Sequence, residues 1–125
     1  MKIGAFDIET ELFDREVGKH LLNVDFVCGC VADSEGDIFY FDNPAKMAGK
    51  LAEYDKLYVH NSSFDLGVME RAGYPICGGK IRDTMIMGWL LDENSPVNLG
   101  DLAFRYCNKK KLDFVLGVRQ HHQEM

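Results

Sequence analysis

Two carboxylates near the N-terminus constrain the fold more than any other feature. Asp7 and Glu9 end an apolar run, Ile3 to Ile8, that is typical of a buried β-strand. Because side chains alternate between the two faces of a strand, Asp7 and Glu9 point the same way, with Cα atoms roughly 7 Å apart at about 3.3 Å rise per residue. Like charges side by side repel each other. The pair is therefore compatible with a hard divalent cation bound through oxygen and, taken alone, also with a solvated strand end near a turn.

Length and composition predict one globular domain. The 125 residues are 46% hydrophobic and 27% charged, and no stretch approaches the ~20 apolar residues that cross a bilayer, so we expect no membrane association. The N-terminus enters the first strand directly, which leaves no room for a signal peptide and favours a cytoplasmic location, in a bacterial cell or a phage-infected host. The net charge of −6 argues against a broad basic face that grips nucleic acid, although an enzyme that holds one strand end remains compatible with it.

The four cysteines do not predict a zinc site. Cys28, Cys30, Cys77 and Cys107 lack the paired C-x2-C spacing of such sites. In a reducing compartment we expect them to remain thiols.

The pattern of apolar residues and turn residues predicts an α/β fold in which helices cover a mixed sheet. Strands are expected over 24–32 and 37–41, joined by a turn at 34–36, and over 56–60. Helices are expected over 45–54 after Pro44, over 64–72, over 83–92 with Asp83 as N-cap, and from Asn98-x-x-Asp101 onward. The buried face of the 83–92 helix should consist of four apolar side chains: Ile86, Met87, Leu90 and Leu91.

A third carboxylate, Asp65, lies in the first turn of the helix that follows strand 56–60. A strand-to-helix crossover could place it beside the end of the first strand. Ser62-x-x-Asp65 also fits a capping box, in which the acid stabilises the helix start. The two interpretations are compatible with each other.

Three motifs resemble those of the DEDD 3′ to 5′ exonucleases, and most closely the proofreading domains of DNA polymerases. They are Phe6-Asp7-Ile8-Glu9-Thr10, His60-Asn61-x-x-Phe64-Asp65, and the stretch from Asp83-Thr84 through Leu90-Leu91 to Leu99-x-Asp101-Leu102-Ala103. The resemblance covers about residues 2 to 107. It implies a ribonuclease-H-like fold, with the N-terminal portion of an exonuclease domain over 1–107 and a tail of uncertain structure over 108–125.

The resemblance also implies a reaction and a ligand set. Asp7 would bridge two Mg²⁺ or Mn²⁺ ions, Glu9 would bind the ion that holds the nucleophilic water, and Asp65 would bind the other. Two such ions about 3.5 to 4 Å apart stabilise the attacking and leaving oxygens of an in-line displacement at phosphorus. The implied substrate is the single-stranded 3′ end of DNA, with RNA also possible.

Further residues match substrate-contacting positions of the family. Thr10 and Leu12 match positions that line the terminal nucleotide, and Asn61 and Phe64 match positions that contact the strand. Phe64 fits a base-stacking platform and, better, a place in the core. Asp83 matches a recurrent family position, and we interpret it as a helix cap.

The family's fourth carboxylate is missing from the sequence. It is an Asp in a Tyr-x3-Asp or His-x4-Asp motif on a late helix, and neither pattern occurs after Asp101, where Asp113 and Glu124 are the acidic candidates. We therefore expect a C-terminally truncated domain.

Three explanations stay open for the missing acid. The missing motif is supplied by a second chain or a polymerase or was lost by truncation, the chain is an inactive nucleic-acid-binding or partner-binding relic, or an unusual local residue completes the site. Outside this family, a metal-binding regulatory domain is the further alternative. Length excludes a polymerase activity within this chain.

Overall fold

The computed structural model describes residues 1–11 and 25–109. The chain divides into two compact units, Met1–Met87 and Gly88–Met125, which are described separately. The predicted boundary between a domain over 1–107 and a tail over 108–125 stays a prediction. No helix among the described residues has the length and apolar character needed to cross a membrane.

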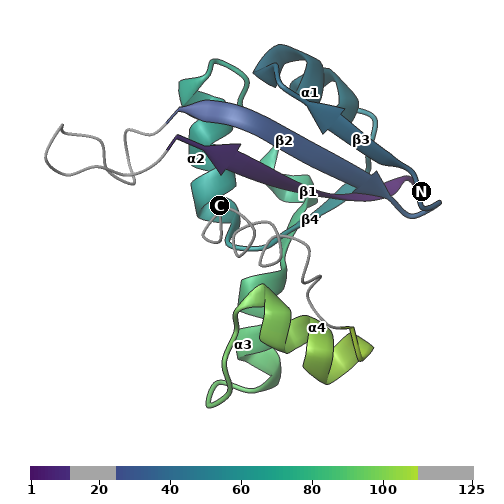
Figure 1. The fold of residues 1–125 in the computed structure, drawn as a ribbon, viewed down its shortest axis with the longest axis vertical. Helices are drawn as coiled ribbons and strands as arrows, with labels where there is room; N and C mark the ends of the chain where they lie inside the picture. The colour runs from purple at the N-terminus through teal and green to yellow at the C-terminus, as the bar shows by residue number, and fades with distance from the viewer. Residues whose placement is uncertain (12–24, 110–125) are drawn as a thin grey trace, which may run out of the picture. The chain divides into compact units, whose positions relative to one another are not determined.

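The first unit is built on a five-stranded mixed sheet (Figure 1). Its strands are β1 (Ile3–Thr10), β2 (Phe26–Asp33), β3 (Ile38–Phe41), β4 (Lys56–Val59) and β5 (Ile81–Asp83), in the spatial order β3-β2-β1-β4-β5. The pairs β1–β2 and β2–β3 are antiparallel, whereas β1–β4 and β4–β5 are parallel. The predicted α/β class with a mixed sheet is confirmed.

The hairpin between β2 and β3 closes through the side chain of Asp33. Its Oδ1 accepts hydrogen bonds from the backbone N–H groups of Glu35 and Asp37, both at 3.0 Å. Gly36 follows in the left-handed region with φ 95°, a conformation that glycine adopts without steric cost. The predicted turn over 34–36 is confirmed, and the three acids of this segment, Asp33, Glu35 and Asp37, come close together.

Two helices cover one face of the sheet. Helix α1 (Pro44–Leu51) begins after Asn43, whose side chain accepts a hydrogen bond from the Lys46 backbone, and α2 (Ser62–Arg71) follows β4. Both contribute to one hydrophobic core that contains Phe6 and Ile8 from the same face of β1, so the two helices lie on one face of the sheet. The core consists of Phe6, Ile8, Val31, Met47, Leu51, Tyr54, Leu57, Val59, Val68 and Met69.

The strand β5 was not predicted. Its three residues follow a short 3₁₀ helix, η1 (Gly78–Lys80), and precede α3 (Thr84–Leu91). Three residues are too few to show an alternating pattern, and the pairing of Leu57–Val59 with Ile81–Asp83 specifies this strand instead. Asp83 therefore ends a strand and also caps the helix that follows it.

The second unit contains a capped helix that matches the sequence expectation. Helix α4 (Leu99–Cys107) starts at Asn98, whose side chain accepts a hydrogen bond from the Asp101 backbone at 2.9 Å and donates one to the Asp101 carboxylate. The predicted helix start at Asn98 is confirmed, but the Asp101 carboxylate bonds to the Asn98 side chain and not to its backbone as in a capping box. Gly88 of α3 packs against Leu102, because a Cβ at Gly88 would lie only 2.7 Å from a Leu102 methyl carbon.

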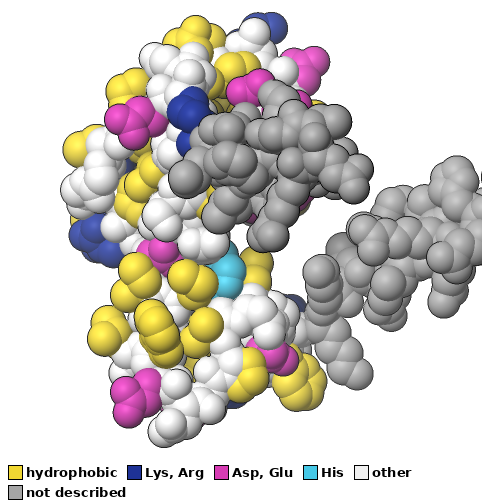
Figure 2. Space-filling view, turned by 90° about the vertical axis from the view of Figure 1, so that its left-hand side faces the viewer, with side chains coloured by type: hydrophobic (Ala, Val, Ile, Leu, Met, Phe, Trp, Pro, Cys, Tyr) yellow, Lys and Arg dark blue, Asp and Glu magenta, His cyan; other side chains and the backbone are white. Residues whose placement is uncertain are grey.

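The predicted buried face of α3 is wrong. Its four apolar residues are exposed, at 48% for Ile86, 43% for Met87, 83% for Leu90 and 68% for Leu91. Helical periodicity identifies the side chains that a covering element would bury, but it does not supply that element, and Gly88 is the buried residue of this helix. Figure 2 shows hydrophobic side chains gathered over α3 and α4.

Candidate metal-binding site at the end of β1

The sheet has an opening beside the C-terminal half of β1, because this half is paired with a neighbouring strand on one side only. On its antiparallel side β1 pairs with β2 from Gly4 to Thr10, but on its parallel side it pairs with β4 only over Ile3–Ala5. The C-terminal half of β1 is therefore free of β4. Such a change in pairing, at the carboxyl ends of parallel strands, is the usual position of a binding crevice in α/β sheets.

Asp65 lies at this opening. It is the single charged side chain that is buried among the described residues, with 3% of its surface exposed, and its carboxylate accepts a hydrogen bond from the Ile8 backbone of β1. Its Oδ2 atom is buried and has no hydrogen-bond partner. Burying a carboxylate oxygen without a partner is costly, so this atom indicates a place for a cation.

The three predicted acids influence one another electrostatically. Burial, then the charge of Asp7, raises the pKa of Asp65 to about 8, although the Ile8 hydrogen bond opposes the shift and Glu9 adds to it. Burial, followed by the charge of Asp7 and a side-chain hydrogen bond with it, also raises the pKa of Glu9. Asp7 and Glu9 of β1 are therefore close enough to Asp65 of α2 for their charges to act on it. Their roles as metal ligands and catalytic groups stay a prediction.

The capping-box interpretation of Asp65 is wrong. The N-cap of α2 is Asn61, which adopts the left-handed conformation with φ 61° and makes no side-chain capping bond. The Ser62 hydroxyl instead donates to Asp83 at 2.8 Å. The Asp65 carboxylate is therefore left to face β1.

The carboxylate of Asp83 replaces the missing caps of two helices. One oxygen accepts hydrogen bonds from the Asn61 backbone at 3.1 Å and from the Met85 backbone at 2.9 Å, and the other accepts from the Ser62 backbone at 2.7 Å. Burial opposes ionisation of Asp83, but these hydrogen bonds outweigh it and lower its pKa. The interpretation of Asp83 as a helix cap is confirmed, and the same group also fixes the start of α2, which carries Asp65.

Asp7, Glu9 and Asp65 do not form a single tight cluster of ligand atoms. Among the described residues, the one group of three His, Cys, Asp or Glu side chains with ligand atoms within 4.8 Å of one another is Asp33, Glu35 and Asp37. The Asp7, Glu9 and Asp65 carboxylates are therefore more widely spaced. Acids that serve two ions about 3.5 to 4 Å apart need not all approach each other so closely. Three carboxylates, one with an unpartnered buried oxygen, match the oxygen ligands that Mg²⁺ and Mn²⁺ prefer.

Three of the four predicted substrate-contacting residues lie within the described part of the chain. Thr10 ends β1 beside Glu9, where the β1–β2 register shifts, and such irregularities are common next to active sites. Asn61 is exposed at the start of α2, and Phe64 is partly buried and packs against the core. Leu12 lies outside the described residues. Nucleic-acid contact by these four positions stays a prediction.

Sequence reasoning missed a row of polar residues beside the acids. Asp7 pairs with Cys30 and Glu9 with Cys28 across the β1–β2 ladder, and Tyr40 of β3 pairs with Cys30. Burial and the charge of Asp7 raise the pKa of the Cys30 thiol, so it is neutral near pH 7 and adds no negative charge. The cysteines were considered only as zinc ligands. Strand parity would have placed them beside the acids once the hairpin register was known.

Comparisons with known proteins agree with the fold. The chain resembles the POL domain of Pol1 from M. smegmatis, solved with a DNA primer-template and dNTP, with a TM-score of 0.67, 19% identity, and coverage of 86% of this chain. It also has a weaker likeness to a family B DNA polymerase from Pyrobaculum calidifontis, with a TM-score of 0.44, 19% identity and coverage of 59% of this chain. The chain spans 19% of the first structure and 11% of the second. No curated protein sequence matches it significantly.

A family model identifies the chain. The model for 3′–5′ exonuclease domains of A-type DNA polymerases matches residues 31–120. The match contains Asp65 and Asp83 and begins beyond Asp7 and Glu9, so the placement of the first two acids rests on the geometry of β1. With most of the chain matched and a mixed sheet of the ribonuclease-H-like type, the predicted resemblance is confirmed. The chain belongs to the 3′–5′ exonuclease family of DNA polymerases.

Proposed function

We propose that this chain hydrolyses phosphodiester bonds at the 3′ end of DNA, with two divalent cations, Mg²⁺ or Mn²⁺, held by Asp7, Glu9 and Asp65. The observation that carries the proposal is the buried, unpartnered Oδ2 of Asp65 at the opening beside β1. Membership in the exonuclease family supports the reaction class. The proposal places the site within residues 1–107.

Each acid has a distinct part in this proposal. The charge of Asp7 acts on both Glu9 and Asp65, which favours it as the ligand shared by both cations. Glu9 is exposed and lies toward the end of β1, where water has access. Asp65 is held by the Ile8 N–H group and loses its proton when a cation arrives, because a positive charge stabilises the carboxylate. When bound, the cations supply charge stabilisation for the attacking and leaving oxygens.

The remaining predicted residues are proposed to contact the substrate. Thr10 and Leu12 continue the chain beyond Glu9 and are proposed to line the terminal nucleotide. Asn61 and Phe64, at the start of α2, are proposed to contact the strand. An unpaired 3′ end is the favoured substrate form, since the terminal phosphate must reach acids that lie at the opening of a sheet. RNA is a further candidate substrate, because its phosphodiester bond offers the same attacking and leaving oxygens to the cations.

The test is a degradation assay on 5′-labelled single-stranded DNA and RNA with Mg²⁺ or Mn²⁺. Wild type is expected to shorten the oligonucleotide from its 3′ end, and Asp7→Asn to slow cleavage by at least ~100-fold, since it removes the shared ligand. Glu70→Gln, which removes an exposed charge from α2, is the matched control and should retain the wild-type rate. Cleavage that survives Asp7→Asn would refute the mechanism.

A second function is favoured by the absence of Tyr-x3-Asp and His-x4-Asp after Asp101. In that case the chain binds a strand end or a partner without cutting, or a second chain such as a polymerase completes the site. A wild-type chain that binds single-stranded DNA but shows no cation-dependent cleavage would support this alternative. Restored cleavage on adding a fragment that carries the late-helix motif would identify a site shared between two chains.

A further inference from the structure

A second acidic group lies at the hairpin between β2 and β3. The ligand oxygens of Asp33, Glu35 and Asp37 all lie within 4.8 Å of one another. Two oxygens bound to the same Ca²⁺ at about 2.4 Å are separated by at most about 4.8 Å, so these three fit around one such ion. The cluster alone would be an ordinary exposed acidic turn.

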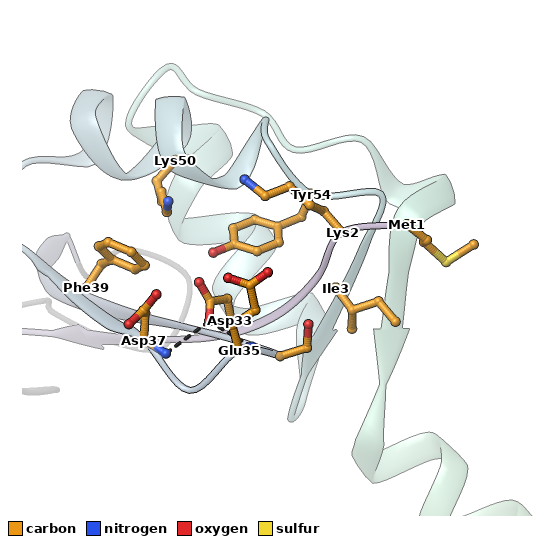
Figure 3. Close-up of a pocket in the computed structure, with 10 residues that line it drawn as sticks. Met1, Lys2, Ile3, Asp33, Glu35, Asp37, Phe39, Lys50 and Tyr54 are labelled. Atoms are coloured by element: carbon orange, nitrogen blue, oxygen red, sulfur yellow. Dashed lines mark hydrogen bonds between the residues drawn. The ribbon is translucent and has the colours of Figure 1, made fainter.

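A buried hydroxyl distinguishes this turn from an ordinary one. Tyr54 is 3% exposed, and its hydroxyl oxygen is buried without a hydrogen-bond partner. The hydroxyl lines the same pocket as the three acids, and Figure 3 shows it pointing toward the hairpin that carries them. A phenol buried without a partner costs about 1 to 3 kcal/mol, so a group that hydrogen-bonds to this hydroxyl would be stabilised here.

Packing keeps the Tyr54 ring in this orientation. The ring lies flat against Gly4 of β1, since a Cβ there would be 2.8 Å from a ring carbon. Gly4 is the β-ladder partner of Asp33. The absence of a side chain at Gly4 therefore places the Tyr54 hydroxyl next to the acid that begins the turn.

Lys2 and Lys50 line the same pocket, and the charge of Lys2 acts on Asp33, but neither lysine forms an ion pair with the three acids. The Lys2 and Lys50 ammonium groups both bond to Glu53, at 3.2 and 3.5 Å. In the described part of the chain, no ion pair joins a lysine or arginine to Asp33, Glu35 or Asp37. Three carboxylates of formal charge −1 each thus share one small turn.

We propose that this turn binds one hard divalent cation, Ca²⁺ in preference to Mg²⁺. Asp33, Glu35 and Asp37 each supply a carboxylate oxygen, water completes the coordination, and the Tyr54 hydroxyl donates a hydrogen bond to a bound water or to Asp33. Ca²⁺ is favoured because it accepts six to eight oxygens in irregular geometry, whereas Mg²⁺ demands a near-ideal octahedron with oxygens about 2.1 Å away.

This site is separate from the one proposed for catalysis. Asp33 pairs with Gly4, whereas Asp7 pairs with Cys30, three residues farther along β1 and on the opposite face of the sheet. The cation would join the β2–β3 hairpin to the end of α1 rather than contact the nucleic acid. The inference does not depend on the proposed nuclease activity.

The test is calorimetric titration of the metal-free full chain with CaCl₂. Wild type should bind one Ca²⁺ with a Kd of roughly 0.1 to 1 mM, as expected for an exposed three-carboxylate site. The double variant Glu35→Gln, Asp37→Asn should weaken binding by at least ~10-fold, and Tyr54→Phe by about 3-fold. Asp33 is left intact because its side chain closes the turn. Circular dichroism checks that each variant is folded.

Two controls separate this site from the catalytic one. Asp7→Asn with Asp65→Asn should leave the Ca²⁺ titration unchanged, and Asp42→Asn with Glu70→Gln removes the same charge as the hairpin variant from other exposed positions. The proposal is overturned if wild type binds no Ca²⁺ below 10 mM (about ten times the expected Kd), if either hairpin or Tyr54 variant binds as wild type does, or if the Asp7, Asp65 variant abolishes binding.

Discussion

Replacing Asp65 by Asn tests whether the ionised Asp65 carboxylate destabilises the chain when no cation is bound. In the metal-free protein its pKa is raised to about 8 from 3.8. The folded state therefore binds one more proton than the unfolded state between those values, and this contribution to stability is lost as pH rises from about 4 to about 8. Asn keeps an oxygen that accepts the Ile8 hydrogen bond and carries no charge. We expect Asp65→Asn to stabilise the metal-free chain at neutral and alkaline pH.

The size of the effect follows from the shift in pKa. One pKa unit corresponds to about 1.4 kcal/mol, so the advantage of the variant over wild type should grow by at most about 1.4 kcal/mol per pH unit from pH 4 and level off above pH 8. Relaxation of the protein around a buried charge makes the difference in unfolding free energy smaller than the whole pKa shift would give. Above pH 8 we expect the variant to be more stable by about 2 to 5 kcal/mol. At pH 4 the two proteins should be nearly equally stable.

The measurement is urea unfolding in EDTA at several pH values, followed by the same series with Mn²⁺. Without metal, Asp65→Asn should be the more stable protein at pH 8, and adding Mn²⁺ should stabilise wild type much more than the variant. Glu70→Gln, an exposed substitution on the same helix, should follow wild type in both series. A variant that is less stable than wild type at pH 8 in EDTA would show that the reasoning about Asp65 is wrong.

Four further outcomes are expected. Asp83→Ala removes the shared cap of α2 and α3 and should destabilise the chain by about 2 to 4 kcal/mol in urea unfolding. Gly29→Ala places a Cβ 2.3 Å from the Met47 sulfur and should cost about 1 to 3 kcal/mol, part of which a shorter residue at position 47 recovers. Asn98→Ala should speed amide exchange at the start of α4 by about 5-fold, equivalent to a cap of ~1 kcal/mol. Mn²⁺ should raise the Tm of wild type by a few degrees and that of Asp7→Asn by much less.

Local sequence patterns predicted most elements of the sheet unit. The apolar run from Ile3 to Ile8 predicted β1, although only one face of this strand is buried. Pro44 and Asn98 marked two helix starts through backbone groups that any helix must satisfy. These signals act over a few residues, so one sequence is enough to find them.

Features that depend on distant contacts were predicted less well. A strand-to-helix crossover allowed Asp65 to lie beside β1 but did not require it, and its local pattern also fitted a capping box that the structure does not contain. Burial of the apolar residues of α3 required a covering element that periodicity does not specify. The hairpin acids were treated only as part of a turn, although the spacing Asp33-x-Glu35-x-Asp37 was a usable signal.

Asp83 links the stability of helix α2, which carries Asp65, to that of helix α3, which carries none of the proposed ligands. Because one carboxylate receives N–H groups from the starts of both α2 and α3, fraying of either helix leaves donors on the other without an acceptor. The two helix starts should therefore open and close as one cooperative unit. A disturbance that begins in α3 would reach the turn that presents Asp65. The position of the Asp65 carboxylate therefore depends on a helix that supplies none of the proposed metal ligands.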